Sequence, residues 1–262
     1  MNHSTYLNAA LNAAQAAGEV IKRLYRRNLE ITVKADRSPV TEADVEAERA
    51  IRRILEARFP DHGFFGEETG SHGMTADYVW LVDPIDGTKS FVREYPMFST
   101  QIALLHEGRL VLGVSSAPVY GELCWAERGS GAWLNGDRLT VSQVETIEAA
   151  TLSAGNLPTL ARSSAWGRYG LLVASVNRAR GYGDFLQYHL LAAGKIDAVI
   201  ESDVNILDIA ALVVILEEAG GQFTDLAGHE VGFHTTSVLA TNGRLHGPVL
   251  DVLQYGCGSG GV

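Results

Sequence analysis

The sequence predicts an α/β (α+β) protein in which two helices and an antiparallel meander precede a half of alternating helices and strands. Apolar residues recur at helical spacing near the N-terminus, and residues 78–142 contain short apolar runs between glycine, proline and Asn-Gly turns. Residues 188–221 then alternate between helical and extended patterns. We expect two parts, 1–150 and 151–262, packed tightly as one functional unit.

The N-terminal segment predicts two helices. Apolar residues recur every three or four positions from Leu7 to Leu24, and basic residues follow at the end of this pattern. A second helix is predicted over residues 41–59, with Thr41 as N-cap and Asp44 at the third helical position, as in a capping box. We expect both helices to flank a sheet.

Composition excludes several classes of protein. Hydrophobic residues make up 46% and charged residues 20%, as in ordinary globular proteins. The formal charge of −10 argues against nucleic-acid or membrane partners, because such surfaces need clustered lysine and arginine. Only two cysteines occur, Cys124 and Cys257, and they lack the spacing of metal ligands, so neither a zinc site nor a disulfide framework is indicated. This low cysteine content fits a reducing cytoplasm, and neither a signal peptide nor a membrane span is indicated, so we expect a cytoplasmic protein.

The stretch WLVDPIDGTKSF, residues 80–91, is the first candidate site. An apolar strand delivers Asp83, a proline ends the strand, and Asp86 follows in the turn. Carboxylates three residues apart in a turn can share a cation, and the Gly-Thr-Lys amides at the start of a following helix would bind an anion. Carboxylates for a hard divalent cation beside amides for an oxyanion describe a metal-assisted phosphate site.

The alternative is ordinary turn chemistry, because Asp-Gly and Pro-X-Asp are common in turns and short motifs recur by chance. Two further stretches add weight to the functional interpretation. GFFGEETG places Glu67 and Glu68 in a glycine-rich loop, and LDIAALVVILEEAGG places Asp208 at the start of an apolar helix. Taken singly, the glutamates would be surface charges and Asp208 an N-cap.

Together, these blocks resemble the inositol monophosphatase superfamily of magnesium-dependent, lithium-sensitive phosphatases. GEE, DPIDGT, and an aspartate followed by alanines and EEAGG occur in the family's order, and the likeness begins at VKADRSPVTEAD, residues 33–44. The resemblance implies a layered αβαβα sandwich, a small phosphate ester as substrate and a homodimer. It also implies two to three Mg²⁺ ions, for which Mn²⁺ would substitute.

The resemblance assigns roles residue by residue. The metal ligands it implies are Glu67, Asp83, the Ile85 carbonyl, Asp86 and Asp208. Glu67 and Thr88 would orient the attacking water, and the Gly87 and Thr88 amides would hold the phosphate, with Asp86 and Asp208 also facing the substrate. Lys34 would lie near the active site and Asp44 would help a third metal through water; the alternatives are a surface lysine and a helix-dipole acid. The implied mechanism is in-line attack of metal-activated water on phosphorus, without a phosphoenzyme.

The segment YGDFLQYHLLAAGKIDAVIE, residues 182–201, bears on the alcohol. Asp184 stands where inositol phosphatases carry threonine or serine, and a carboxylate there would suit a cationic leaving group. Together with DPIDGTKSF, SPVTEAD and DIAAL, it makes the chain most similar to the histidinol-phosphate phosphatase branch, whose reaction belongs to histidine biosynthesis. Glu201 matches the position that contacts the leaving alcohol. For Asp184, a helix N-cap is the alternative.

Several alternatives stay open at the level of sequence. Leu207 replaces the family's usual tryptophan, so the pocket wall differs. Arg178 and Arg180 either approach a second phosphate, as a 3′-phosphoadenosine 5′-phosphate phosphatase would need, or face water; Arg93 is likewise undecided. Inositol monophosphatase is the other alternative within this chemistry. A non-catalytic, metal-binding regulatory protein is an alternative of another class, which the full set of ligand residues opposes.

Overall fold

The computed structural model describes residues 3–27, 31–33 and 39–256. The chain divides into two compact units. The first contains Met1–Asp137 and Leu207–Ile215, and the second contains Arg138–Ile206 and Leu216–Val262. A late segment of the chain therefore belongs to the first unit. Within the described residues, no helix combines the length and the apolar character needed to cross a lipid bilayer.

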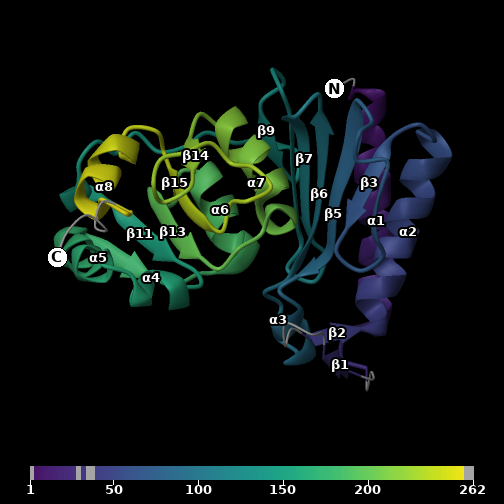
Figure 1. Ribbon diagram of the computed structural model, residues 1–262, viewed down its shortest axis with the longest axis horizontal. Helices are drawn as coiled ribbons and strands as arrows, with labels where there is room; N and C mark the ends of the chain where they lie inside the picture. Colours follow the sequence, from purple (N-terminus) through teal and green to yellow (C-terminus); the bar gives the residue numbers. More distant parts are fainter. Residues whose placement is uncertain (1–2, 28–30, 34–38, 257–262) are drawn as a thin grey trace. The chain divides into compact units, whose positions relative to one another are not determined.

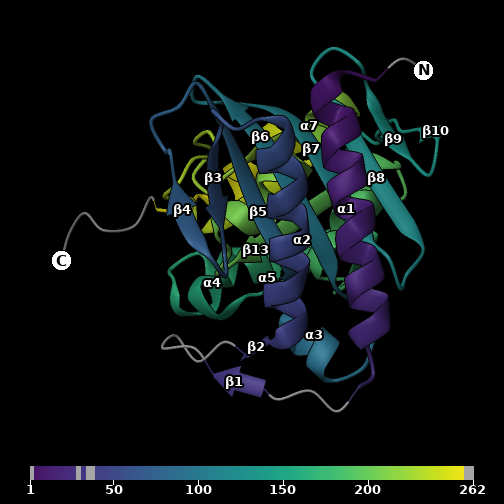
Figure 2. The same cartoon turned by 90° about the vertical axis from the view of Figure 1, so that its right-hand side faces the viewer.

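The first unit opens with two capped helices, α1 (Thr5–Leu24) and α2 (Glu42–Arg58). Ser4 caps α1 because its Oγ accepts a hydrogen bond from the Leu7 N–H at 3.0 Å. Thr41 caps α2, and Asp44 Oδ2 accepts from the Thr41 N–H at 2.8 Å, which confirms the predicted capping box. Both helices lie across one face of a sheet (Figures 1 and 2).

That sheet has eight strands in the order β10-β9-β8-β7-β6-β5-β3-β4. Strands β5 to β9 pair antiparallel in chain order, which confirms the predicted meander, and β3 joins β5 in parallel. A separate pair is formed by β1 and β2. The strands and the short helix of this unit are β1 (Ile31–Val33), β2 (Pro39–Thr41), β3 (Gly63–Gly66), β4 (Gly70–His72), β5 (Tyr78–Asp86), α3 (Thr88–Val92), β6 (Ser99–His106), β7 (Arg109–Ala117), β8 (Glu122–Glu127), β9 (Ala132–Leu134) and β10 (Asp137–Arg138).

Alternation along β7 separates the two faces of this sheet. Leu112 and Val114 are fully buried in the core that α1 and α2 cover. Gly113 points the other way, toward α7 (Ile206–Glu218), where a Cβ would lie 2.2 Å from the Ala211 carbonyl oxygen. Since only glycine permits this approach, Gly113 lets the α7 segment lie directly on the second face.

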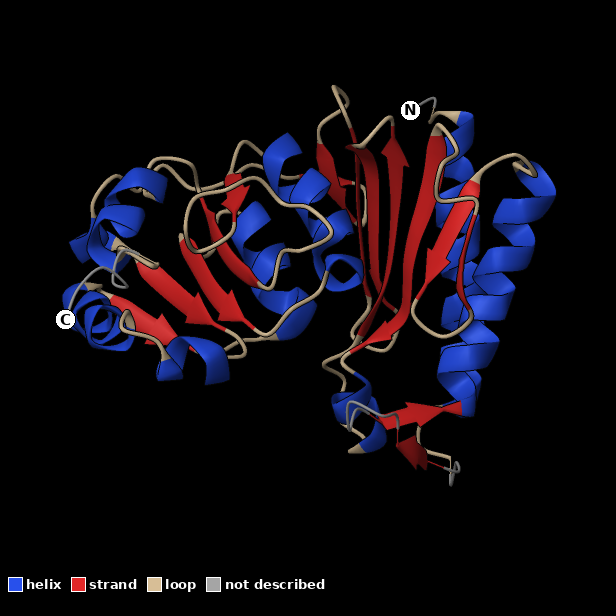
Figure 3. Ribbon diagram, viewed as in Figure 1, coloured by secondary structure: helices blue, strands red, loops and turns tan. Residues whose placement is uncertain are grey.

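The second unit is built on a five-stranded mixed sheet in the order β12-β11-β13-β15-β14. Strand β11 pairs in parallel with β12 and β13, whereas β15 pairs antiparallel with β13 and β14. The helices and strands of this sheet and its surroundings, coloured by type in Figure 3, are η1 (Ile147–Ala149), β11 (Thr151–Ala154), α4 (Pro158–Arg162), α5 (Trp166–Ser175), β12 (Arg178–Arg180), α6 (Asp184–Ala192), β13 (Ala198–Ser202), β14 (Gln222–Thr224), β15 (Ser237–Thr241) and α8 (His246–Leu253).

The two faces of the second sheet differ in chemistry. On one face, Leu152 and Ile200 pack in an apolar core with residues of α4, α5 and α8. On the other face, Ser153 and Glu201 both bind the side chain of Gln187 from α6. Alternation along β11 and β13 thus directs apolar side chains to one helical layer and polar ones to the other.

Candidate metal centre

The end of β5 carries the DPID motif on an irregular strand. The sequence predicts that Pro84 ends this strand, and that prediction is wrong: β5 continues to Asp86 through a shift in its pairing with β6. The Ile85 N–H donates to Asp83 Oδ1 at 2.9 Å, and the Thr100 hydroxyl donates to the Pro84 carbonyl oxygen at 2.8 Å. Because an irregularity of this kind leaves one residue out of the ladder, it accommodates a proline that has no N–H.

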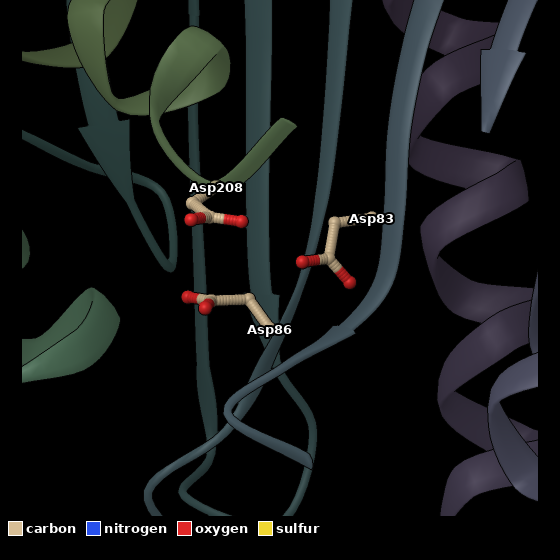
Figure 4. A group of neighbouring side chains, drawn as sticks. All are labelled: Asp83, Asp86 and Asp208. Atoms are coloured by element: carbon tan, nitrogen blue, oxygen red, sulfur yellow. The ribbon is translucent and has the colours of Figure 1, made fainter. Parts of the chain in front are cut away.

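Three aspartates converge beside this irregularity (Figure 4). Asp83, Asp86 and Asp208 each place a carboxylate oxygen within 4.8 Å of the other two. Asp83 is 2% exposed and the other two are half-buried. Helix α7 begins at Ile206, so Asp208 lies within the first turn, and the alternative of an N-cap role is wrong. All three belong to the first unit, because Leu207–Ile215 is part of it.

The electrostatics of this cluster fit a divalent cation. Burial raises the pKa of Asp83 well above its ordinary 3.8, and the charges on Glu67, Asp86 and Asp208 raise it further, as does a side-chain hydrogen bond with Glu67. The donors are all carboxylate oxygens, which hard cations such as Mg²⁺ prefer. These donors therefore match such an ion. Its positive charge would offset the repulsion among the carboxylates, which is one cause of the raised pKa of Asp83.

Thr88 and Asp44 meet next to the cluster. The Thr88 hydroxyl lies 3.1 Å from Asp44 Oδ1 and 3.0 Å from the Ile85 carbonyl oxygen, and it shares one proton between these two acceptors. Burial raises the pKa of Asp44, while hydrogen bonds from Thr41 and Thr88 oppose that shift. The structure thus links α2 to the residue after Gly87 through a fully buried carboxylate.

The predicted helix after the DPID motif is α3, a short helix whose N-cap is Gly87. Gly87 has a φ of 90°, and a Cβ there would lie 2.7 Å from the Met97 carbonyl oxygen. Both observations require glycine. The backbone can therefore turn sharply after Asp86 and present the first amides of α3 beside the carboxylates.

Glu67 and Glu68 lie in the turn between β3 and β4. The Glu67 N–H donates to the Val82 carbonyl oxygen at 3.1 Å, next to Asp83 in the chain. Glu48, which none of the sequence motifs singled out, is a buried residue of α2 whose carboxylate accepts from the N–H of Glu68 at 2.7 Å. The sequence contains one indication of this residue: Glu48 follows Asp44 by one helical turn, so both lie on the same face of α2.

Two predicted substrate residues lie in the second unit. Asp184 is the first residue of α6 and has a φ of 44°; Gly183 is the N-cap, so the alternative of an N-cap role for Asp184 is wrong. Glu201 is 4% exposed. Its carboxylate accepts from Gln187 Nε2 at 2.8 Å and from the Tyr188 hydroxyl at 2.6 Å.

The other candidates from the sequence are three arginines, one leucine and one lysine. Arg93 is exposed just after α3, and Arg178 and Arg180 are exposed on the edge strand β12. Leu207 is buried in the first turn of α7. Lys34 lies outside the described residues.

A carboxylate cluster beside the start of a helix, on a layered α/β unit, is typical of proteins that handle phosphate with a bound metal. The chain belongs to the inositol monophosphatase family, a family of metal-dependent phosphatases, whose model matches residues 2–254. The predicted superfamily is thereby confirmed.

Individual relatives agree with this assignment. A histidinol-phosphatase from Mycobacterium tuberculosis is 42% identical over 262 residues, covering 98% of this chain and 100% of its own. A histidinol-phosphatase from Chlorobaculum parvum is 38% identical over 225 residues, covering 86% of this chain and 87% of its own. The crystal structure of extragenic suppressor protein SuhB from Bartonella henselae matches with a TM-score of 0.89 at 32% identity, covering 97% of this chain and 100% of that one. This likeness confirms the predicted layered α/β fold.

Proposed function

We propose that this protein is a Mg²⁺-dependent histidinol-phosphate phosphatase, which hydrolyses L-histidinol phosphate to L-histidinol and phosphate. The convergence of Asp83, Asp86 and Asp208 is the observation that carries the reaction class. The relatives named histidinol-phosphatase, together with Asp184, support the choice of substrate. A cytoplasmic homodimer is part of the same proposal and rests on the cysteine content and the family resemblance.

In this proposal, the three aspartates, Glu67 and the Ile85 carbonyl oxygen hold Mg²⁺, two to three ions in all. A bound Mg²⁺ ion supplies Lewis acidity, which lowers the pKa of a coordinated water and neutralises charge on the phosphate. The Ile85 oxygen already accepts from the Thr88 hydroxyl, so this carbonyl and this hydroxyl are fixed relative to one another.

The protein's own groups then orient the nucleophile. The Thr88 hydroxyl is aligned by Asp44 and Ile85, and in that position it can bind the attacking water. The Glu67 carboxylate, which hydrogen-bonds to Asp83, would accept the proton that the water loses. The amides of Gly87 and Thr88 would receive the phosphate oxygens at the start of α3.

Specificity for the alcohol would come from Asp184 and Glu201. Histidinol carries an ammonium group and an imidazole, so negative charge near the leaving group favours it over neutral alcohols. Asp184, which is half-buried, would supply that charge. Because both oxygens of Glu201 accept hydrogen bonds from protein groups, we propose that Glu201 acts mainly through its charge.

Release of inorganic phosphate from a panel of esters tests this function. The panel contains L-histidinol phosphate, inositol 1-phosphate and 3′-phosphoadenosine 5′-phosphate, each with Mg²⁺ and with EDTA. We expect kcat/KM to be highest for histidinol phosphate and activity to vanish with EDTA. If histidinol phosphate were hydrolysed no faster than the other esters, the substrate assignment would be wrong. Full activity in EDTA would exclude a metal-dependent mechanism.

The variant Asp184→Asn isolates the charge. Asparagine tolerates a positive φ as well as aspartate does, so the backbone at this position can stay as it is. We expect kcat/KM for histidinol phosphate to fall about tenfold, while kcat/KM for inositol 1-phosphate changes by less than about twofold. An equal loss for both esters would mean that Asp184 does not recognise the cationic group.

A further inference from the structure

The turn that carries Glu67 is held from two sides within the first unit. It comprises residues 67–69, between β3 and β4. At its start, the Glu67 N–H donates to the Val82 carbonyl oxygen at 3.1 Å, which joins the turn to the strand that delivers Asp83. At its end, the turn is bound by side chains of α2, and these contacts have no role in the mechanism described above.

Glu48 provides the main contact from α2. Its side chain is fully buried, and it accepts from the N–H groups of Glu68 and Thr69 at 2.7 Å each and from the Thr69 hydroxyl. A buried carboxylate is tolerated only when its oxygens are hydrogen-bonded in this way. Gly66 makes room for it, since a Cβ there would lie 2.4 Å from Glu48 Oε1.

Arg52, one helical turn further along α2, completes the arrangement. Its Nη1 donates to the Thr69 hydroxyl oxygen at 3.0 Å, so this hydroxyl donates to Glu48 and accepts from Arg52. Arg52 is itself fixed by Glu56, at 2.7 Å from its Nε, and by the ring of Phe64, whose centroid lies 5.2 Å from its Cζ. The Thr69 hydroxyl is therefore held between the side chains of Glu48 and Arg52.

We propose that Glu48 is a positioning residue for the metal centre: by holding Glu68 and Thr69, it places Glu67 against Asp83 and so sets the affinity for divalent cations. The proposal rests on the proposed function only in taking the acidic cluster as the cation site. Glu48 does not act as a ligand itself, because it is fully buried and its carboxylate is committed to the turn. Removing a group that hydrogen-bonds to the ligand region without touching the metal typically lowers metal affinity by about 10- to 100-fold.

The test measures Mn²⁺ binding directly, by electron paramagnetic resonance of the free ion, with no substrate present. Glu48→Gln places an NH₂ group against one of the two backbone N–H donors, so the turn loses one of its anchors. Thr69→Val removes the hydroxyl at nearly constant volume, and Thr69→Ser keeps it. We expect the dissociation constant for Mn²⁺ to rise about tenfold or more in Glu48→Gln, to rise less in Thr69→Val, and to stay at the wild-type value in Thr69→Ser.

Asp197→Asn is the matched control. Asp197 is a buried carboxylate of the second unit, 5% exposed, that accepts from the Thr151 N–H and the Ser142 hydroxyl. Its loss should lower the Tm without changing Mn²⁺ affinity at a temperature where the variant is folded. Wild-type affinity in both Glu48→Gln and Thr69→Val, or an equal loss in Asp197→Asn, would overturn the proposal.

The outcome is separable from that of the proposed function. If the wild-type protein hydrolyses no ester of the panel but its Mn²⁺ affinity depends on Glu48, the phosphatase assignment fails and the positioning role stands. If the esters are hydrolysed but the Mn²⁺ affinity is the same in the Glu48 and Thr69 variants as in wild type, the phosphatase assignment stands and the positioning role fails. Should Glu48→Gln not fold, the comparison of Thr69→Val with Thr69→Ser decides the matter alone.

Discussion

Replacing Asp86 by asparagine should stabilise the metal-free protein while abolishing its activity. Carboxylate oxygens of Asp83, Asp86 and Asp208 lie no more than 4.8 Å apart, so their charges repel one another when no cation is bound. The Asp86→Asn variant keeps the shape of the side chain and removes one of the charges.

The magnitude follows from Coulomb's law. Two unit charges 4.8 Å apart repel by about 3.5 kcal/mol at an effective dielectric constant of about 20. Asp86 is half-buried, and the raised pKa of Asp83 favours its uncharged form and so lessens the repulsion; we therefore expect a net gain of about 1–2 kcal/mol in the free energy of unfolding. For a chain of this size, that corresponds to a rise of about 2–8 °C in Tm.

The gain should depend on pH in a defined direction. The pKa of Asp83 lies above its ordinary 3.8 in the folded protein, so the folded state holds this proton more tightly than the unfolded chain does. Its favourable contribution is therefore complete at low pH and is lost as pH rises through the raised pKa. We expect the Tm difference between Asp86→Asn and wild type to be larger at pH 8 than at pH 5.

Calorimetric scans in EDTA and in saturating Mg²⁺ measure both effects. In EDTA the variant should melt above wild type; in Mg²⁺ the order should reverse, because only the wild-type protein gains binding energy, about 2.7 kcal/mol at a hundredfold excess over the dissociation constant. Asp137→Asn, at an exposed position on β10, controls for the loss of a negative charge. A lower Tm for Asp86→Asn in EDTA, or undiminished turnover, would refute the reasoning.

Three further predictions concern the fold. Gly113→Ala should lower the free energy of unfolding in urea by about 2–3 kcal/mol, because its Cβ would meet the Ala211 carbonyl. Gly170→Ala, at a helical position with open space around it, should raise the same quantity by about 0.5–1 kcal/mol; similar values for both variants would contradict the contact with Ala211. Thr41→Ala should cost about 1 kcal/mol by removing the cap of α2, and Thr41→Ser should restore most of it; equal stabilities of the two variants would argue against capping. His246 is buried and desolvation lowers its pKa from 6.5 to about 4, so stability should fall as pH drops from about 6.5 to 4, and His246→Gln should flatten this part of the urea-midpoint profile; an unchanged slope would exclude His246 as its origin.

Local features of the sequence predicted much of this molecule correctly. The capping box at Thr41 and the antiparallel meander depend on residues close together in the chain, so their patterns are readable directly. The motif blocks were specific enough to place the chain in its family and to nominate the three aspartates that converge.

Only the tertiary structure decided how those residues are held. The strand passes Pro84 because its pairing with β6 shifts there, and Glu48 binds the turn after Glu67 across a gap of about twenty positions in the chain. Asp208 reaches Asp83 because Gly113 lets α7 approach the sheet. Contacts of this kind join residues far apart in sequence, and the burial they create raises the pKa of Asp83 and Asp44. A local pattern can place Glu48 on the same face of α2 as Asp44, but it cannot reveal which distant groups these carboxylates meet.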